Sequence, residues 1–385
     1  MRFEFATARR VLFGEGRIRE AGPVAAEMGR RALVVTGKDS SRAAGLVDNL
    51  QAAGVETAPF SVSGEPSVET IDQAIEQARQ EACELVVGVG GGSVIDTAKA
   101  VAVLLQNPGK ALDYLEVVGK GEKLHNPSVP MIAIPTTAGT GSEVTRNAVL
   151  GVPEHQVKVS LRSPNMLPRL ALVDPELTYS LPPDVTARTG MDALTQLIEA
   201  YVSNQANPIT DGLCLEGIQL AAGALLRAYR DGDDHPARGD MAAASLLGGM
   251  ALANAKLGAV HGFAGTLGGR YPAPHGAVCA RLLPIVMEAN LYALNKREPE
   301  NLAIKRYRDV ARILSGDDQA GPEYGAAWVQ SLCETLKIQP LAAFGVDRAD
   351  FQAIIEQSAR SSSMRGNPIQ LTPAEMEEIL DQAVD

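Results

Sequence analysis

Two patterns of hydrophobic and polar positions follow one another along the chain. Up to residue 183, short aliphatic runs alternate with longer amphipathic stretches. The runs cover 30–37, 85–92 and 131–137, and the amphipathic stretches cover 41–54, 69–80 and 93–105. Strands that alternate with helices at this spacing are typical of a mostly parallel sheet with helices on both faces. The first half of the chain is therefore predicted to be an α/β domain.

The second half of the chain has no such strand-like runs. From residue 184 onward, long Ala- and Leu-rich stretches at helical spacing take over, at 192–204, 212–229 and 239–256. The sequence Leu-Pro-Pro-Asp at 181–184 is the predicted joint, because paired prolines stop one element and an Asp caps the next. We therefore expect an α/β domain over 1–183 and an all-helical domain over 184–385.

Composition and charge exclude several classes of protein. A chain of 385 residues with 45% hydrophobic and 21% charged residues is typical of a soluble protein with two cores. The net charge of −11 argues against nucleic acid or an anionic membrane as a partner. The N-terminus does not resemble a signal peptide, and no run of about 18 apolar residues predicts a membrane span. The four cysteines lack CxxC spacing, so neither a disulfide framework nor a cysteine-only metal site is expected, and a reducing cytoplasm fits best.

A glycine-rich turn is the strongest motif of the first half. The apolar run from Leu85 ends in Gly90, Gly91, Gly92 and Ser93, and a helix with Asp96 in its first turn follows. Glycines allow the backbone to approach a pyrophosphate, whose charge is met by free N–H groups and the positive end of a helix. The spacing departs from GxGxxG, so a tight strand-to-helix turn without a ligand remains the alternative.

A second loop, over 134–143, also follows an apolar run. Its hydroxyls suit the oxygens of phosphate and ribose, although a turn that satisfies its own backbone has the same composition. The side chains concerned are Thr136, Thr137, Thr140 and Ser142. Two such loops at the carboxyl ends of strands in one sheet predict a ligand at that edge, because open α/β sheets bind ligands there.

Four segments, in this order, resemble the iron-containing (group III) alcohol dehydrogenase family, whose fold is shared with glycerol dehydrogenase and dehydroquinate synthase. They are GGGSVIDTAKA (90–100), PTTAGTGSEVT (135–145), GMDALTQLIEAYVS (190–203) and HGFAGTLGGRYPAPHG (261–276). The resemblance implies that the N-terminal domain binds a nicotinamide dinucleotide and that the helical domain carries a metal. It also implies catalysis in the cleft between them, and Lys158 resembles a family lysine at the cofactor. Dimers are common in this family, so a homodimer or higher homo-oligomer is expected.

The same resemblance places the metal ligands at Asp192, Gln196, His261 and His275. The family typically has an Asp-x-x-x-His pair on one helix, whereas this chain has Gln196 in the second position. Residues four apart face the same way on a helix, so the spacing is retained. A neutral amide oxygen is a weaker ligand than imidazole for iron or zinc. Asp192, His261 and His275 alone still make a three-ligand site with open positions, and they are the predicted catalytic residues.

Two further positions depart from the family pattern. Gly265 stands where many members have a histidine near the nicotinamide, so a proton relay through that imidazole is absent. Gly37 stands where members that prefer NAD have an Asp that repels a 2′-phosphate. Lys38, Ser40, Ser41 and Arg42 follow it and could meet a phosphate, which favours NADP(H) with NAD(H) as the alternative.

The sequence therefore predicts an NAD(P)-dependent oxidoreductase that interconverts a small alcohol and its aldehyde or ketone with help from a divalent metal. A metal-independent reductase of an activated carbonyl, similar to maleylacetate reductase, also fits Gln196 and Gly265. In that case, Arg270 and Arg365 could meet an acidic or phosphorylated substrate. A lyase related to dehydroquinate synthase and a nucleotide-binding protein without activity are the remaining alternatives.

Overall fold

Six parallel strands form one sheet in the order β1-β8-β5-β4-β2-β3. They are β1 (Val11–Phe13), β2 (Arg31–Gly37), β3 (Glu56–Val62), β4 (Leu85–Gly90), β5 (Met131–Pro135) and β8 (Leu170–Val173). The three predicted strands correspond to β2, β4 and β5, and the other three are additional. An antiparallel hairpin of β6 (Asn147–Val152) and β7 (Val157–Arg162) is also additional. The computed structural model describes residues 2–116, 118–155 and 157–385.

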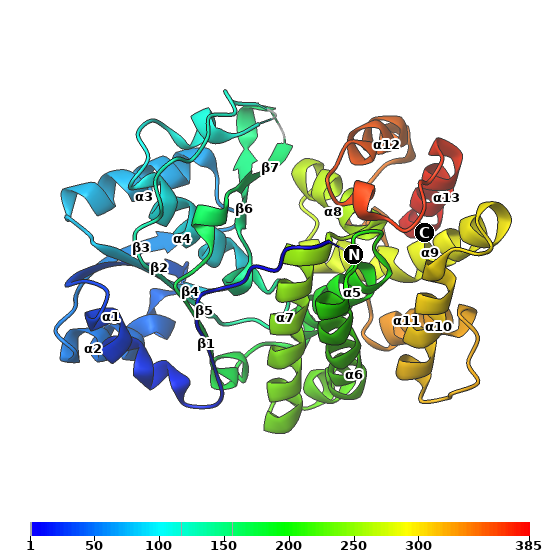
Figure 1. The fold of residues 1–385 in the computed structure, drawn as a ribbon, viewed down its shortest axis with the longest axis horizontal. Helices are drawn as coiled ribbons and strands as arrows, with labels where there is room; N and C mark the ends of the chain where they lie inside the picture. The colour runs from blue at the N-terminus through cyan, green and yellow to red at the C-terminus, as the bar shows by residue number, and fades with distance from the viewer. Residues whose placement is uncertain (1, 117, 156) are drawn as a thin grey trace. The chain divides into compact units, whose positions relative to one another are not determined.

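Side chains of the sheet alternate between two apolar cores. Leu33 and Val35 of β2 belong to the core that includes α3 (Val68–Gln80) and α4 (Gly92–Leu104). Ala32 and Val34 belong to the opposite core. That core includes α1 (Ala21–Ala26) and α2 (Ala44–Ala52). Figure 1 shows the two helix pairs on opposite sides of the strands. Both faces of β2 are covered, which explains its unbroken apolar run.

The chain divides into two compact units. The α/β unit comprises Thr7–Thr137 and Gly141–Tyr179. The helical unit comprises Met1–Ala6, Ala138–Thr140 and Ser180–Asp385. The units therefore differ from the predicted ranges 1–183 and 184–385 at the N-terminus, in one loop and by a few residues at the joint. The predicted fold class, a mostly parallel α/β region followed by an all-helical region, is confirmed.

Helix α5 (Pro183–Val202) packs against α6, α7 and α9 of the helical unit. Of the remaining helices, α8, α11 and α13 pack against α9, α10 packs against α11 and α6, and α12 packs against α8. Their bounds are α6 (Pro208–Arg230), α7 (His235–Ala255), α8 (Ala259–Arg270), α9 (His275–Arg297), α10 (Leu302–Ser315), α11 (Glu323–Thr335), α12 (Phe351–Ala359) and α13 (Pro373–Val384). The expected cap at Asp184 is wrong, because Pro182 is the N-cap and Asp184 lies in the first turn, 2.9 Å from Arg188.

Two helices of this unit, α6 and α9, are long and apolar enough to cross a membrane by length and composition. Within α9, 78% of the apolar window is buried inside the structure. The corresponding share of α6 is 39%. Packing in the protein core therefore accounts for the hydropathy of α9.

Candidate functional site

Four potential metal-binding side chains meet inside the helical unit: Asp192, His261, His275 and Cys279. One ligand atom from each lies within 4.8 Å of the others. Asp192 Oδ1 is 3.3 Å from His261 Nε2 and 3.7 Å from His275 Nε2. The three strong ligands expected from sequence thus come together, and a fourth donor, Cys279, joins them.

The helix starts explain how these distant residues meet. His275 is the first residue of α9, and Cys279 follows one turn later on the same face. A Cβ on Gly276 would lie 2.2 Å from the carbonyl oxygen of Arg188, so only glycine allows α9 to approach α5 this closely. The approach brings the start of α9 to Asp192, which lies one turn beyond Arg188 on α5.

A carboxylate that the sequence analysis did not single out orients His261. Glu199 lies on α5, seven residues after Asp192, and its Oε2 is 2.6 Å from His261 Nδ1. Its other oxygen accepts a hydrogen bond of 2.7 Å from the backbone N–H of Val260. With Nδ1 held by this carboxylate, Nε2 is the ring nitrogen that faces Asp192 and can bind a metal once it gives up its proton. The i, i+7 spacing from Asp192 could have identified Glu199, because it places both carboxylates on one helix face.

The cluster is buried on most sides and open at one. The side chains of Asp192, Glu199 and His261 are 4%, 5% and 9% exposed, whereas that of His275 is 38% exposed. A small molecule can therefore reach the cluster beside His275. On α8, one turn after His261, a Cβ on Gly265 would meet no atom within 4 Å, so the missing histidine leaves open space.

The electrostatics of the cluster suit a divalent cation. Burial alone raises the pKa of Asp192, but His275 and His261 outweigh it and hold that pKa below its usual range. Negative charge at Cys279, against the effect of burial, raises the pKa of His275 to about 9. Burial opposes protonation of His261 as well, yet Cys279 and Asp192 raise its pKa well above the usual value. Protonated imidazoles thus offset the negative charge of the cluster. A bound divalent metal ion would offset that charge in their place.

Gln196 is turned partly away from this role. Its side-chain N–H donates a hydrogen bond of 2.8 Å to the carbonyl oxygen of Gly139. Its Oε1 is buried and has no hydrogen-bond partner among the described residues. A buried carbonyl without a partner is costly, so this oxygen is available as a weak metal ligand. The other residues singled out in this unit, Arg270 and Arg365, donate to Gln357 and to the carbonyl oxygen of Arg360.

In the α/β unit, the two predicted cofactor loops are neighbours. Strands β4 and β5 are paired, and the N–H of Thr136 donates to the carbonyl oxygen of Gly90 at 2.9 Å. Gly91 is the N-cap of α4, and a Cβ on it would lie 3.6 Å from Thr137. The half-buried residues at the start of α4, Gly92 and Ser93, therefore lie beside a hydroxyl-rich strand end. This arrangement suits a phosphate group. Thr140, also predicted to bind the cofactor, lies in the short segment assigned to the helical unit.

Asp96 and Ser142 are hydrogen-bonded to each other. Ser142 Oγ donates to Asp96 Oδ1 at 2.5 Å, and Asp96 Oδ2 accepts from the N–H of Val149 at 2.8 Å. The buried Lys99 lies 3.0 Å from the same carboxylate. The two predicted cofactor residues thus join α4 to the segment after the second loop. Burial raises the pKa of nearby Glu143 to about 7, against the attraction of Lys99.

The residues predicted to select the cofactor lie at the end of β2. A Cβ on Gly37 would meet no atom within 4 Å. Ser40 and Ser41 are exposed, and Asp39 accepts hydrogen bonds from the N–H and the hydroxyl of Ser41. Lys158 of β7 lies 3.4 Å from Glu65, so its charge is already paired.

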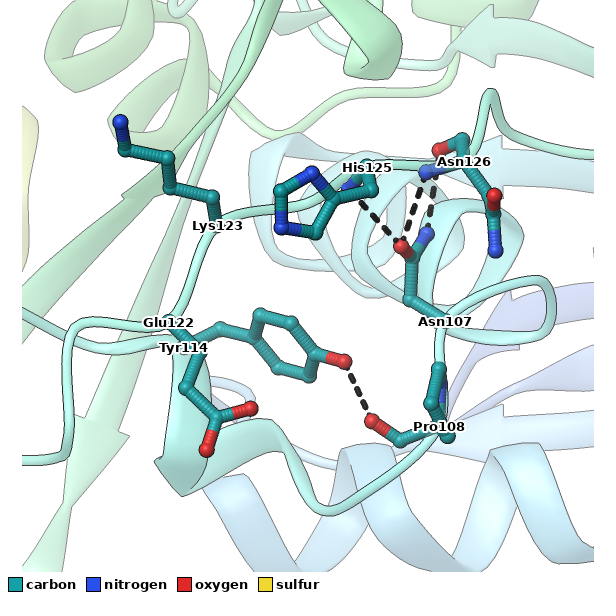
Figure 2. A pocket seen from close by; sticks show the side chains of 7 residues that line it. All are labelled: Asn107, Pro108, Tyr114, Glu122, Lys123, His125 and Asn126. Carbon is teal, nitrogen blue, oxygen red and sulfur yellow. Dashed lines mark hydrogen bonds between the residues drawn. The ribbon is translucent and has the colours of Figure 1, made fainter.

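A pocket in the α/β unit contains none of the predicted site residues. Figure 2 shows its lining: Asn107, Pro108, Tyr114, Glu122, Lys123, His125 and Asn126. Asn107 Oδ1 accepts hydrogen bonds from the N–H groups of His125 and Asn126, and the Tyr114 hydroxyl donates to the carbonyl oxygen of Pro108. These bonds fix the loop after α4.

Comparison with known families matches both halves of the chain. Residues 8–175 match the model described as iron-containing alcohol dehydrogenase, and residues 186–384 match the C-terminal model of the Fe-containing alcohol dehydrogenase family. Alcohol dehydrogenase 4 of Schizosaccharomyces pombe is 39% identical over 380 residues, covering 97% of this chain and 87% of that protein. The 1,3-propanediol dehydrogenase of Klebsiella pneumoniae is 38% identical over 368 residues, covering 92% of each.

Solved structures agree with these relatives. A crystal structure of 1,3-propanediol oxidoreductase has a TM-score of 0.92 and 35% identity, and it covers all of both chains. Sulfoacetaldehyde reductase from Bifidobacterium kashiwanohense in complex with NAD+ has a TM-score of 0.88 and 30% identity, covering 100% of this chain and 99% of that one. The predicted oxidoreductase activity on alcohols is confirmed, and neither the carbonyl reductase nor the lyase alternative is favoured. The chain belongs to the iron-containing alcohol dehydrogenase family, whose members use NAD(P) and a metal.

Proposed function

We propose that this protein transfers a hydride between the nicotinamide of NAD(P) and the carbinol carbon of a small alcohol, with Asp192, His261 and His275 holding a divalent metal. The observation that carries the proposal is the donor cluster, which is buried at Asp192 and His261 but open beside His275. A divalent metal held there supplies Lewis-acid stabilisation of negative charge on the substrate oxygen. The oxygen of Gln196 is a weak further ligand in this proposal.

The residues of the chain have distinct parts in the reaction. Asp192 provides the negative charge that retains a cation. Glu199 fixes the ring of His261, so that Nε2 faces the cluster. The open space at Gly265 admits the substrate, and in the absence of an imidazole there the hydroxyl proton leaves through water. The relatives named alcohol dehydrogenase 4 and 1,3-propanediol dehydrogenase support a small alcohol or diol as the substrate class.

For the cofactor, we propose that Gly90, Gly91, Gly92 and Ser93 bind the pyrophosphate through backbone N–H groups. Hydroxyls of Thr136, Thr137 and Thr140 contact the remaining polar oxygens, while Asp96 and Ser142 hold the two loops together. Lys158 reaches the dinucleotide from β7 by releasing Glu65. The adjacency of β4 and β5 supports this assignment.

The proposed cofactor is NADP(H), because Gly37 carries no carboxylate to repel a 2′-phosphate and Ser40, Ser41 and Lys38 are exposed. The acidic Asp39 nearby works against it. The variant Gly37→Asp restores a carboxylate, and we expect it to raise KM for NADPH at least about tenfold, which corresponds to ~1.4 kcal/mol, with little change for NADH. Gly45→Asp adds the same charge on the exposed face of α2 as a control. An unchanged ratio of NADPH to NADH efficiency in Gly37→Asp would exclude this role.

We further propose a cytoplasmic homodimer or higher homo-oligomer. Free cysteines at all four positions support a reducing compartment. Light scattering of the purified protein tests the assembly, and a monomer at working concentration contradicts it.

The main test combines metal analysis with NADH and NADPH oxidation on a panel of short aldehydes, before and after a chelator. We expect one divalent metal per chain, activity that the chelator removes, and recovery when metal is returned. Full activity after complete removal of metal would show that the donor cluster has no part in catalysis. The variant Gln196→His adds an imidazole on the correct helix face, and tighter metal binding is the expected result.

A further inference from the structure

The sulfur of Cys279 lies within reach of a metal held by Asp192, His261 and His275, although no part of the proposed reaction uses it. Its side chain is fully buried on α9, one turn after His275. The sulfur lies 3.6 Å from His275 Nε2 and 3.8 Å from His261 Nε2. Both nitrogens face Asp192, and His261 Nδ1 is held by Glu199 on the opposite side of its ring.

The distances between the donor atoms match the edges of a tetrahedron around one ion. Metal–ligand bonds of about 2.0–2.1 Å for nitrogen and oxygen and about 2.3 Å for sulfur give edges of about 3.4 Å between N or O atoms and about 3.6 Å from N to S. The observed edges are 3.3 and 3.7 Å from Asp192 to the two imidazoles, and 3.6 and 3.8 Å from the sulfur. The two remaining edges, between the imidazoles and from Asp192 to the sulfur, are no longer than 4.8 Å, so a small inward movement of the side chains brings the four donor atoms around one ion.

Gln196 is a weak candidate for the fourth ligand. One end of its amide is held by the carbonyl oxygen of Gly139, and the other offers only a neutral oxygen. A thiolate is both charged and a better donor for a late divalent metal. The position that lost an imidazole on α5 therefore has a replacement donor on α9.

We propose that the Cys279 thiolate is a direct ligand of the metal, completing a set of one sulfur, two imidazole nitrogens and one carboxylate oxygen with Asp192, His261 and His275. The proposal rests on the proposed metal-assisted function and specifies its ligands. Two anionic donors balance the charge of a divalent ion. Sulfur and imidazole donors favour zinc or cobalt over iron(II) or magnesium, and the open side beside His275 leaves room for the substrate oxygen as a fifth donor.

The test uses the full-length protein, stripped of metal and reloaded with Co²⁺. A cobalt–thiolate bond gives a charge-transfer band in the near ultraviolet, which oxygen and nitrogen ligands do not give. We expect this band in the wild-type protein and in Cys333→Ser, a control that changes another buried cysteine of the same unit. We expect no band in Cys279→Ser.

Zinc affinity, measured by competition with a chromogenic chelator, is the second readout. Loss of an outer partner of a metal site costs about 10- to 100-fold in affinity. A lost ligand should cost more, so we expect Cys279→Ser to bind zinc over about 100-fold more weakly, with Cys333→Ser close to the wild type. The variant Cys279→His should recover zinc affinity without recovering the cobalt–thiolate band.

The outcomes separate this inference from the function on which it rests. A wild-type cobalt protein without the band, or zinc affinity in Cys279→Ser equal to that of the control, overturns Cys279 as a ligand and leaves the Asp192, His261 and His275 site standing. A wild-type protein that takes up neither cobalt nor zinc overturns the metal-assisted function itself. The wild-type spectrum needs no variant, so the inference stays open to refutation if Cys279→Ser does not fold.

Discussion

The donor cluster of the helical unit is built from side chains, whereas the cofactor loops of the α/β unit are built mainly from backbone groups. The cluster relies on side chains that are up to 87 positions apart, counting from Asp192 to Cys279, and that helix packing brings together. The loops rely on backbone N–H groups and small residues that are continuous in sequence, at the ends of paired strands. A side-chain site can exchange one ligand for another from a neighbouring helix. At Gly90 the backbone site has no room for an added Cβ.

The largest effect is expected when the negative charge of Asp192 in the donor cluster is removed. In Asp192→Asn the buried carboxylate becomes neutral, and the attraction for a divalent cation is lost. Metal catalysis of this kind contributes several kcal/mol, so kcat/KM should fall by roughly 10²- to 10⁴-fold. Steady-state kinetics and metal content measure the effect. Cofactor affinity should stay unchanged, and a parallel loss of NAD(P)H binding would contradict the assignment of Asp192 to the metal rather than to the cofactor.

A smaller effect is expected when the orientation of a ligand, rather than the ligand, is changed. Glu199→Gln keeps the size of the side chain but removes the carboxylate that accepts the proton of His261 Nδ1. We expect about 10- to 100-fold weaker metal binding or activity. Glu288→Gln, on the exposed face of α9, is the control. Metal affinity equal in the two variants would show that Glu199 only supports the fold.

The backbone site is tested by adding one methyl group. A Cβ on Gly90 would lie 2.6 Å from Val94, so Gly90→Ala forces α4 away from β4. Overpacking of this kind costs about 1–3 kcal/mol, and the displaced amides should weaken cofactor binding by a similar amount. Fluorescence titration with NADPH and NADH gives the affinity. Gly45→Ala, which meets nothing within 4 Å in α2, should leave binding unchanged.

The smallest expected effect is on how the stability of the α/β unit changes with pH, and it comes from the buried carboxyl group of Glu143. Because burial raises the folded-state pKa of Glu143 to about 7, the folded protein binds this proton more tightly than the unfolded chain does. Stability from this group is therefore present at low pH and is lost as the pH rises through 7. The free energy of unfolding of this unit should fall by about 1 kcal/mol between pH 6 and pH 8.

Denaturant unfolding of wild type and Glu143→Gln at the two pH values measures this difference. The glutamine variant cannot ionise, so its stability should change less with pH than that of the wild type. An identical pH dependence in both proteins would show that Glu143 titrates as an exposed carboxyl does.

The same contrast explains what the sequence could predict. The glycine turn and the hydroxyl-rich loop are continuous, so their pattern alone indicated β4, α4 and β5. The hairpin of β6 and β7 was missed, although residues of β6 alternate between buried and half-buried positions. Its short strands give too few alternations to stand out from a loop.

From the sequence, only the residues of the cluster that lie in family motifs could be predicted. Asp192, His261 and His275 lie in such motifs, whereas Cys279 and Glu199 become recognisable only when helix faces are known. The spacing of four from His275 was a usable signal for Cys279, since the same spacing linked Asp192 to Gln196. What no periodicity could supply is the packing of α9 on α5, which depends on the contact between Gly276 and Arg188.

The path of the chain between its two units limits how the protein can be dissected. The chain passes from one unit to the other after Ala6, Thr137, Thr140 and Tyr179. A gene fragment that begins at 184 would therefore lack Gly139, whose carbonyl oxygen accepts a hydrogen bond from the buried side-chain amide of Gln196. It would also lack Ala6, whose backbone N–H and carbonyl oxygen are hydrogen-bonded to the side chain of Asn254. Each buried polar group left without a partner costs about 1–3 kcal/mol. The helical half that begins at 184 is thus an unsuitable module for transplantation or separate expression.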